Sequence, residues 1–111
     1  MTLTELTGGK SLELNEVVGT NTIKIAASGR LDTNTSIQLE NLIKERSPNV
    51  TSLILVLSGI EYISSAGLRV VLLAHKTMLS YSGKMIVQSP SDFCKQVFKA
   101  TGMESVLNIQ E

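Results

Sequence analysis

Two adjacent serines, Ser64 and Ser65, stand where a buried strand is expected to end and a helix to begin. The apolar run 53–57 is typical of a strand that is buried on both faces. After the serines, residues suited to a buried helix face recur at helical spacing, at Leu68, Val71, Leu72, His75 and Leu79. The first amides of a helix are unpaired and carry partial positive charge, which favours a hydroxyl cap or an anion there. From this window alone, a simple N-cap is the favoured interpretation and an anion site is the alternative.

The other residues that could carry chemistry point away from catalysis. His75 is the only histidine, and it lies on or near the apolar stripe of the predicted helix, so we expect it to be packed or half-buried. Cys94 has no second cysteine or nearby histidine and is predicted to act as a small buried hydrophobe. The segment 8–10 lacks the glycine frame of a phosphate loop, and no metal-ligand spacing occurs. We therefore predict no catalytic residue, no metal and no cofactor. A hydrolase that uses Ser65 is the weakest hypothesis, because its base would lie far along the same helix.

Length, composition and charge narrow the class of protein. At 111 residues the chain is long enough for one domain with a real core. No apolar run approaches the roughly 20 residues of a membrane span, and residues 1–5 lack the features of a signal peptide. A single cysteine favours the reducing cytoplasm. Ten basic residues balance ten acidic ones, which argues against nucleic-acid binding.

The pattern along the chain predicts an α/β fold. We expect residues 1–10 to form a loose lead-in and residues 11–111 to form one domain. The predicted strands are 11–17, 22–28, 52–57, 84–88 and 106–109, with turn residues 19–21 between the first two. A helix follows each of the second, third and fourth strands. The order β-β-α-β-α-β-α-β implies a mixed, mostly parallel sheet that opens with an antiparallel hairpin.

The predicted helices carry start and stop signals. A capping box at 35–38 begins the first helix, which ends at Ser47-Pro48-Asn49 and buries Leu39, Leu42 and Ile43. The second helix spans about 66–81 and ends at Ser82-Gly83.

The third predicted helix opens within 89–92. Ser89 is its expected cap, Pro90 its first residue and Asp92 its early acid, and Gly102 closes it. Its expected buried face consists of Phe93, Val97 and Phe98.

Parallel strands bring their carboxyl ends to one edge of the sheet. Three polar turns are expected there, at 29–33, 64–65 and 89–91. Ligands and partners of open α/β sheets gather at this edge. The topology therefore predicts a site that combines the carboxylate of Asp32, the two serine hydroxyls and the helix N-termini.

The chain resembles the STAS domain family, which comprises bacterial anti-sigma factor antagonists and cytoplasmic domains of sulfate transporters. The resemblance covers about 11–109 and depends on the order and spacing of several short motifs. These are Gly29-Arg30-Leu31-Asp32 followed by Thr35 and Leu39, Ile63-Ser64-Ser65-Ala66-Gly67-Leu68, Gly83, and Thr101-Gly102-Met103.

The resemblance implies a regulatory binding module. In the antagonists, the serine two positions before the Gly-Leu pair, here Ser65, is phosphorylated by a partner that is both an anti-sigma factor and a serine kinase. The unmodified antagonist binds this partner and frees the sigma factor, and a phosphatase resets the phosphorylated form. The expected partner-binding residues are Asp32, Thr33, Ser64, Ser65, Gly67, Arg69 and Leu73. Leu73 and Arg69 are expected on an exposed stripe with Lys76 and Ser80, beside Val70 and Thr77.

One position departs from the family pattern. Many phosphorylated antagonists carry aspartate immediately before the target serine, where this chain has Ser64. The change either eases the approach of a nucleotide phosphate or removes an orienting group and leaves Ser65 a poor substrate. A second function is consistent with the resemblance: a STAS subunit of a lipid or anion transporter that docks on a membrane-associated ATPase.

Overall fold

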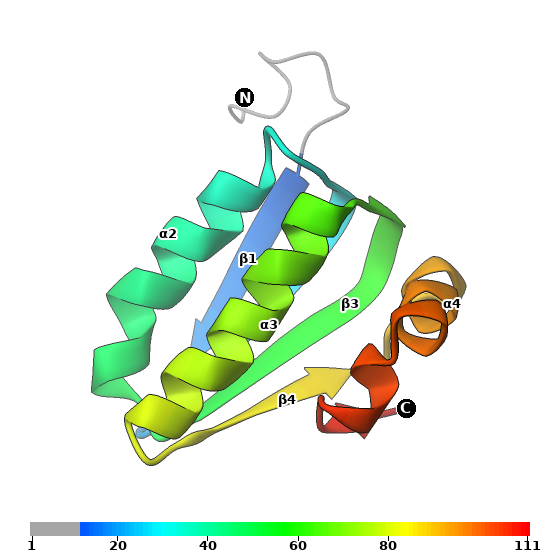
Figure 1. The fold of residues 1–111 in the computed structure, drawn as a ribbon. Helices are drawn as coiled ribbons and strands as arrows, with labels where there is room; N and C mark the ends of the chain where they lie inside the picture. The colour runs from blue at the N-terminus through cyan, green and yellow to red at the C-terminus, as the bar shows by residue number, and fades with distance from the viewer. Residues whose placement is uncertain (1–11) are drawn as a thin grey trace, which may run out of the picture.

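The computed structural model describes residues 12–111 as an α/β domain (Figure 1). The predicted lead-in, residues 1–10, lies outside the described residues. The elements are β1 (Leu12–Val18), β2 (Thr22–Leu31), α2 (Ser36–Arg46), β3 (Ser52–Ile63), α3 (Ser65–Ser80), β4 (Lys84–Gln88), α4 (Asp92–Thr101) and β5 (Ile109–Gln110). Short 3-10 turns occupy Ser47–Asn49 and Met103–Ser105. Among these residues, no helix is long and apolar enough to cross a membrane.

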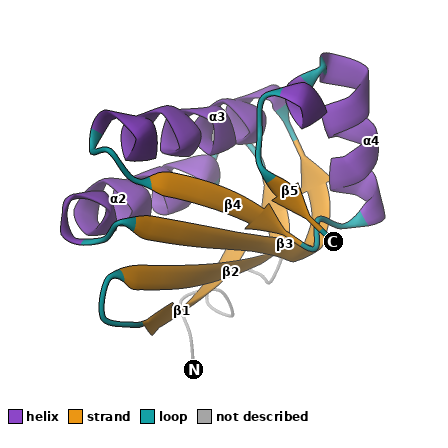
Figure 2. Ribbon diagram, turned by 90° about the horizontal axis from the view of Figure 1, so that it is seen from below, coloured by secondary structure: helices purple, strands orange, loops and turns teal. Residues whose placement is uncertain are grey.

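The sheet has the predicted topology. Its order is β1-β2-β3-β4-β5, with β1 antiparallel to β2 and every other pair parallel. Figure 2 shows α2 and α3 side by side on one face of the sheet, whereas α4 lies apart from them. The predicted mixed, mostly parallel fold is confirmed.

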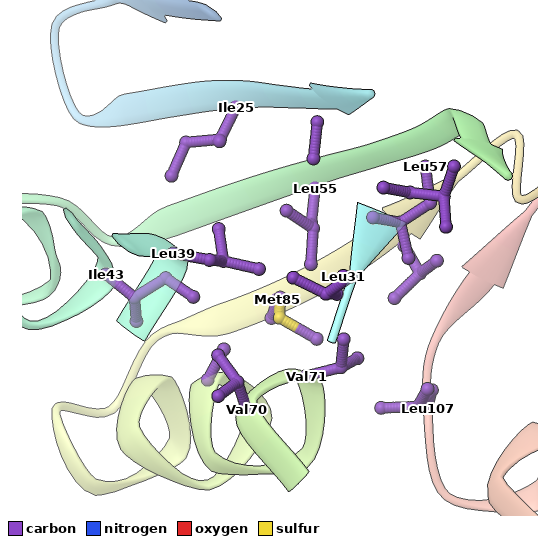
Figure 3. Packing of buried hydrophobic residues seen from close by; sticks show 14 of the residues in the cluster. Ile25, Leu31, Leu39, Ile43, Leu55, Leu57, Val70, Val71, Met85 and Leu107 are labelled. Atoms are coloured by element: carbon purple, nitrogen blue, oxygen red, sulfur yellow. The ribbon is translucent and has the colours of Figure 1, made fainter. Parts of the chain in front are cut away.

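The core lies between the sheet and the pair α2 and α3. Side chains that alternate along the central strands point to it, and Figure 3 shows Leu39, Ile43, Val70 and Val71 packed toward Leu55 and Met85. Each fully buried leucine or isoleucine there contributes about 1.5–3 kcal/mol. The prediction that 53–57 is buried on both faces is wrong, because Ile54 and Val56 are only half-buried on the face away from α2 and α3.

The buried stripe of α3 is rotated from the predicted one. Its buried residues are Gly67, Val70, Val71, Ala74 and Met78. Leu68, Leu72 and His75 flank this stripe, and Leu79 is 56% exposed. Val70, which was expected beside the exposed stripe, belongs to the core.

The start of α4 also differs from the prediction. Ser91, and not Ser89, caps the helix, because its hydroxyl accepts the Cys94 amide at 3.2 Å. Pro90 precedes the helix, and Ser89 takes a positive φ of 49° to make the turn. Cys94 and Phe98 are buried as expected, but Phe93 is 38% exposed and packs its ring on Tyr62. Gly102 closes the helix with a left-handed φ of 79°, as predicted.

Strand lengths are the remaining difference. The last strand is limited to Ile109–Gln110, because residues 103–105 turn and Leu107 inserts into the core instead of pairing. In contrast, β2 and β3 extend well past their predicted ends to Leu31 and Ile63, with register shifts between Ala26 and Ser28 and between Gly29 and Arg30. These extensions form the rim on which the candidate site is built.

The first turn of α3 lies in direct contact with the end of β2. An added Cβ at Gly67 would overlap the Leu31 carbonyl oxygen and would lie 2.8 Å from Leu31 Cγ and 3.0 Å from Ile63 Cγ1. A backbone oxygen cannot swing aside as a flexible side chain can, so only glycine fits here.

We predict that Gly67→Ala destabilises the protein by about 1–3 kcal/mol through overpacking. The sign of this change in unfolding free energy is informative, because a Gly→Ala substitution within a helix otherwise stabilises the protein by up to about 1 kcal/mol. Urea unfolding followed by circular dichroism measures the change. Lys76→Ala, at an exposed position of the same helix, is the control and should stay within about 0.5 kcal/mol of wild type. A Gly67→Ala protein as stable as wild type would contradict the close contact.

Candidate functional site

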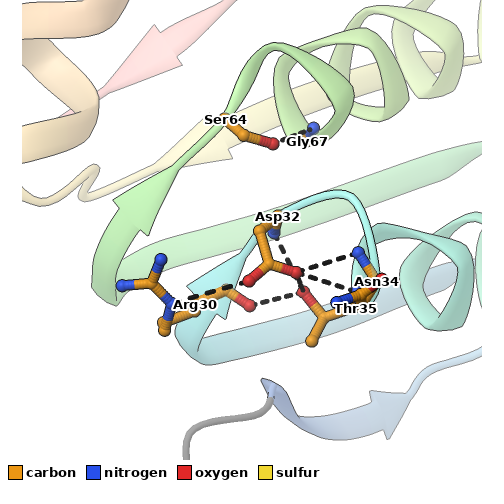
Figure 4. A network of polar contacts seen from close by, with 6 residues as sticks. All are labelled: Arg30, Asp32, Asn34, Thr35, Ser64 and Gly67. Carbon is orange, nitrogen blue, oxygen red and sulfur yellow. Dashed lines mark hydrogen bonds and ion pairs between the residues drawn. The ribbon is translucent and has the colours of Figure 1, made fainter.

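The ends of β2 and β3 bring two of the three predicted turns together. Leu31 pairs with Ile63, and the Ser64 amide donates to the Leu31 carbonyl at 2.9 Å. Asp32 and the start of α3 therefore face each other across the rim (Figure 4).

The third turn, 89–91, does not join this rim. The Ser91 amide donates to the Leu57 carbonyl, six residues before the end of β3. The prediction of three turns at one edge is therefore wrong, because β3 continues beyond the end of β4. Shortly after this turn, the Phe93 ring packs on Tyr62 of β3.

The two serines divide the roles that the sequence left open. Ser64 is the N-cap: its backbone is extended, and its hydroxyl accepts the Gly67 amide at 3.3 Å. Ser65 is the first helical residue and is exposed. Within residues 12–111, no hydrogen bond engages the Ser65 side chain. The cap is thus complete without Ser65, whose hydroxyl faces solvent at the positive end of the helix.

Asp32 holds the turn that faces these serines. Its Oδ1 accepts the amides of Asn34 and Thr35 at 3.0 and 3.1 Å, and its Oδ2 lies 3.5 Å from Arg30 Nε. The hydrogen bond from the Thr35 amide is the largest cause of a lowered pKa for Asp32, and partial burial opposes it. Asp32 is therefore ionised at neutral pH and is part of the local structure.

The predicted capping box at 35–38 is wrong. Thr35 makes no side-chain cap to α2; its hydroxyl instead donates to the Arg30 carbonyl at 2.6 Å and accepts the Asp32 amide at 2.9 Å.

A groove of about 270 Å³ runs between α2 and α3 beside the serines. Its lining residues are Thr33, Ser36, Ile37, Glu40, Ala66, Arg69, Val70 and Leu73. Three of the expected partner-binding residues, Thr33, Arg69 and Leu73, thus meet in one place. Ile37 is 57% exposed and was missed; an isoleucine outside the predicted face of the first helix was the available signal.

Gly67, the remaining predicted site residue, does not line the groove. Gly67 is buried and makes the contact with Leu31, so its visible role is packing. Two larger hollows, of about 560 and 500 Å³, lie around β5 and contain none of the predicted site residues.

His75 cannot act as a base for Ser65. It follows Ser65 by ten residues on the same helix, a distance of about 15 Å along the axis. It is half-buried, and its Nδ1 is enclosed with no hydrogen-bond partner among the described residues. Cys94 is buried, as predicted, and burial raises the pKa of its thiol, which makes it unreactive. In residues 12–111, no group of three or more histidine, cysteine or acidic side chains is arranged to hold a metal ion.

Comparison with protein families places these features in a known class. The model of the STAS domain matches residues 13–111. The chain belongs to the STAS domain family. No curated protein sequence matches it.

Solved structures of STAS proteins share the fold. An anti-sigma factor antagonist from Mycobacterium paratuberculosis superposes with a TM-score of 0.81 at 19% identity, covering 91% of this chain and 86% of that one. The antagonist SpoIIAA in its unphosphorylated form superposes with a TM-score of 0.74 at 23% identity, covering 88% of this chain and 86% of that one. The phosphorylated form of SpoIIAA, from Bacillus, superposes with a TM-score of 0.70 at 23% identity, covering 88% of this chain and 89% of that one. At these identities the similarity shows the fold.

We predict that Asp32→Ala destabilises the protein by about 1 kcal/mol at pH 7, as loss of a helix-start acceptor usually does. Asp32→Asn should lose less, because an amide oxygen still accepts the Asn34 and Thr35 amides. Chemical denaturation across pH measures both changes.

The pH dependence gives a second measurement for Asp32. Its folded-state pKa is lowered, so its contribution is present above the unfolded value of about 3.9 and is lost as pH falls through the folded value. The gap between wild type and Asp32→Asn should therefore narrow below about pH 4. An equal gap at pH 7 and at pH 2–3 would contradict the structural role of the carboxylate.

Proposed function

We propose that this STAS protein is an anti-sigma factor antagonist. It binds an anti-sigma factor with serine kinase activity, which frees the sigma factor, and phosphorylation of Ser65 cancels that binding. A phosphatase that acts on phosphorylated Ser65 resets the cycle. The observation that carries the proposal is the exposed Ser65 hydroxyl, which the helix cap does not use and which lies beside the groove between α2 and α3.

The fold is suited to a modification at this position. A phosphate adds roughly −1.5 to −2 charges at pH 7. The first amides of α3 and the positive end of its dipole stabilise such a charge. Because Ser64 keeps the cap, the modification breaks no hydrogen bond that the structure describes in residues 12–111. The phosphate instead weakens binding, because a partner would have to bury this charge against its own surface.

The proposed partner surface surrounds Ser65. Ser64 and Asp32 form its rim, and Thr33, Arg69 and Leu73 form the groove that leads away from it. Gly67 serves this surface indirectly, because it allows α3 to lie close to Leu31. The protein acts in the cytoplasm by binding other proteins, with no role in catalysis, nucleic-acid binding or membrane insertion.

The transporter-subunit hypothesis leads to a different partner. A tagged Ser65→Ala protein, which phosphorylation at this position cannot release, should recover a small ATPase of the histidine-kinase type with its sigma factor displaced. Recovery of a transporter ATPase instead would favour the alternative and overturn the antagonist proposal.

We predict that the cognate kinase and ATP place one phosphate on Ser65, detected by peptide mass spectrometry. Ser65→Ala should bind the partner with wild-type affinity and should lose little stability, because the cap is Ser64. Ser65→Asp should bind more weakly, although one charge imitates phosphate imperfectly.

Ser64→Ala is the matched control for this prediction. It should cost about 1 kcal/mol of stability while Ser65 is still phosphorylated. Phosphate found on Ser64, or undiminished binding by fully phosphorylated protein, would overturn the switch.

We also predict that Leu73→Asp weakens partner binding by at least tenfold, because it places a charge in the apolar part of the groove. Leu73 is 36% exposed, so the melting temperature should fall only slightly. Leu79→Asp, at a more exposed position of α3 outside the groove, is the control and should bind normally. Calorimetric titration and thermal melts provide the two measurements. Equal affinities for the two variants would remove Leu73 from the interface.

A further inference from the structure

Among the described residues, Arg69 is the one cation that lines the groove between α2 and α3. Within residues 12–111 its guanidinium makes no ion pair or hydrogen bond. The neighbouring cations are engaged: Lys44 pairs with Glu40 at 2.8 Å, and Arg30 lies against Asp32 and 4.3 Å from the Tyr62 ring centre. Arg69 is therefore available to a group that arrives from outside the fold.

The position of Arg69 matches that of Ser65. The two residues are four apart on α3 and are both exposed. Side chains of a helix lean toward its N-terminus, and residues four apart lie one above the other. The Arg69 guanidinium thus reaches the turn that carries Ser65, and its fork of donors suits phosphate oxygens.

We infer that Arg69 holds the phosphate on Ser65 and that this pairing removes the available cation of the groove. The inference rests on the proposed phosphorylation of Ser65. Arg69 then has two alternative partners, the phosphate in the modified protein and an acidic group of the bound partner in the unmodified one.

The charges of the groove identify the matching partner chemistry. Glu40 is neutralised by Lys44, so the unmodified groove presents the apolar Ile37 and Leu73 together with one unpaired positive charge. It fits a segment that carries an apolar side chain and a carboxylate. After phosphorylation the Ser65–Arg69 pair has a net negative charge, whereas Asp32 across the rim is paired with Arg30. The same carboxylate is then repelled, so phosphorylation both adds charge and withdraws the partner's counter-ion.

The test measures the phosphate itself and needs no partner. Phosphoserine is incorporated at position 65 during translation, and the second pKa of the phosphate is followed by ³¹P NMR. A guanidinium beside the phosphate favours the dianion, so Arg69→Gln should raise this pKa by about 0.3 units, the size of an i, i+4 ion pair. Lys76→Gln, two turns farther along the exposed side of α3, is the matched control and should leave it unchanged. The other nearby charges, Arg30, Asp32, Glu40 and Lys44, are the same in all three proteins.

Two outcomes decide the inference. The inference is supported if the second pKa of the phosphate rises in Arg69→Gln alone and if the Arg69 Nε–Hε NMR signal of the wild-type protein shifts on phosphorylation. An equal pKa in wild type and Arg69→Gln, or equal rises in both variants, overturns it. Failure of the cognate kinase to modify Ser65 would instead refute the proposed function without changing the pKa comparison, so the two failures are distinguishable.

Discussion

The contact between the first turn of α3 and the last residue of β2 positions the whole candidate site. The Ser64 amide donates to the Leu31 carbonyl, and the absence of a side chain at Gly67 lets the helix lie against the same carbonyl. Asp32 directly follows Leu31 at the end of β2, and Ser65 directly follows Ser64 at the start of α3. One backbone contact therefore sets the separation between an ionised carboxylate and an exposed hydroxyl.

Around this contact, the groups that hold the fold together and the groups that face solvent are different residues. Ser64 satisfies the helix amide, and Asp32 with Thr35 satisfies the turn before α2. Ser65, Arg69 and much of Leu73 remain directed to solvent. A charge placed on Ser65 can thus alter a binding surface while the hydrogen bonds of the fold stay intact. Such a separation is what a reversible switch needs, because the modified protein must remain folded in order to be reset.

The sequence was sufficient for the topology, for a hydroxyl cap within the pair Ser64 and Ser65, and for the burial of Cys94, because each depends on strong local patterns; it did not say which serine is the cap. It was misleading where two local signals compete. Thr35 with Gln38 matches a capping box, but Asp32 Oδ1 accepts the Thr35 amide, and the Thr35 hydroxyl donates to the Arg30 carbonyl instead of capping α2. It was also insufficient where packing decides. Ser58-Gly59 resembles a strand end, yet pairing with β2 carries β3 on to Ile63, which moves the rim away from β4. The rotated stripe of α3 and the exposure of Ile37 follow from how α2 and α3 meet, which no single helix pattern contains.

The serine at position 64, where the resemblance to phosphorylated antagonists implies aspartate, is consistent with the proposed switch on physical grounds. A residue there must accept the Gly67 amide, and the Ser64 hydroxyl does so. What the replacement removes is one negative charge beside Ser65, where it would oppose both an incoming nucleotide and the phosphate that remains. The carboxylate of Asp32, held by its own turn, is still present across the rim. With Arg69 unpaired one helical turn away, the local balance of charge at Ser65 is more favourable to a phosphate than it would be with aspartate at position 64.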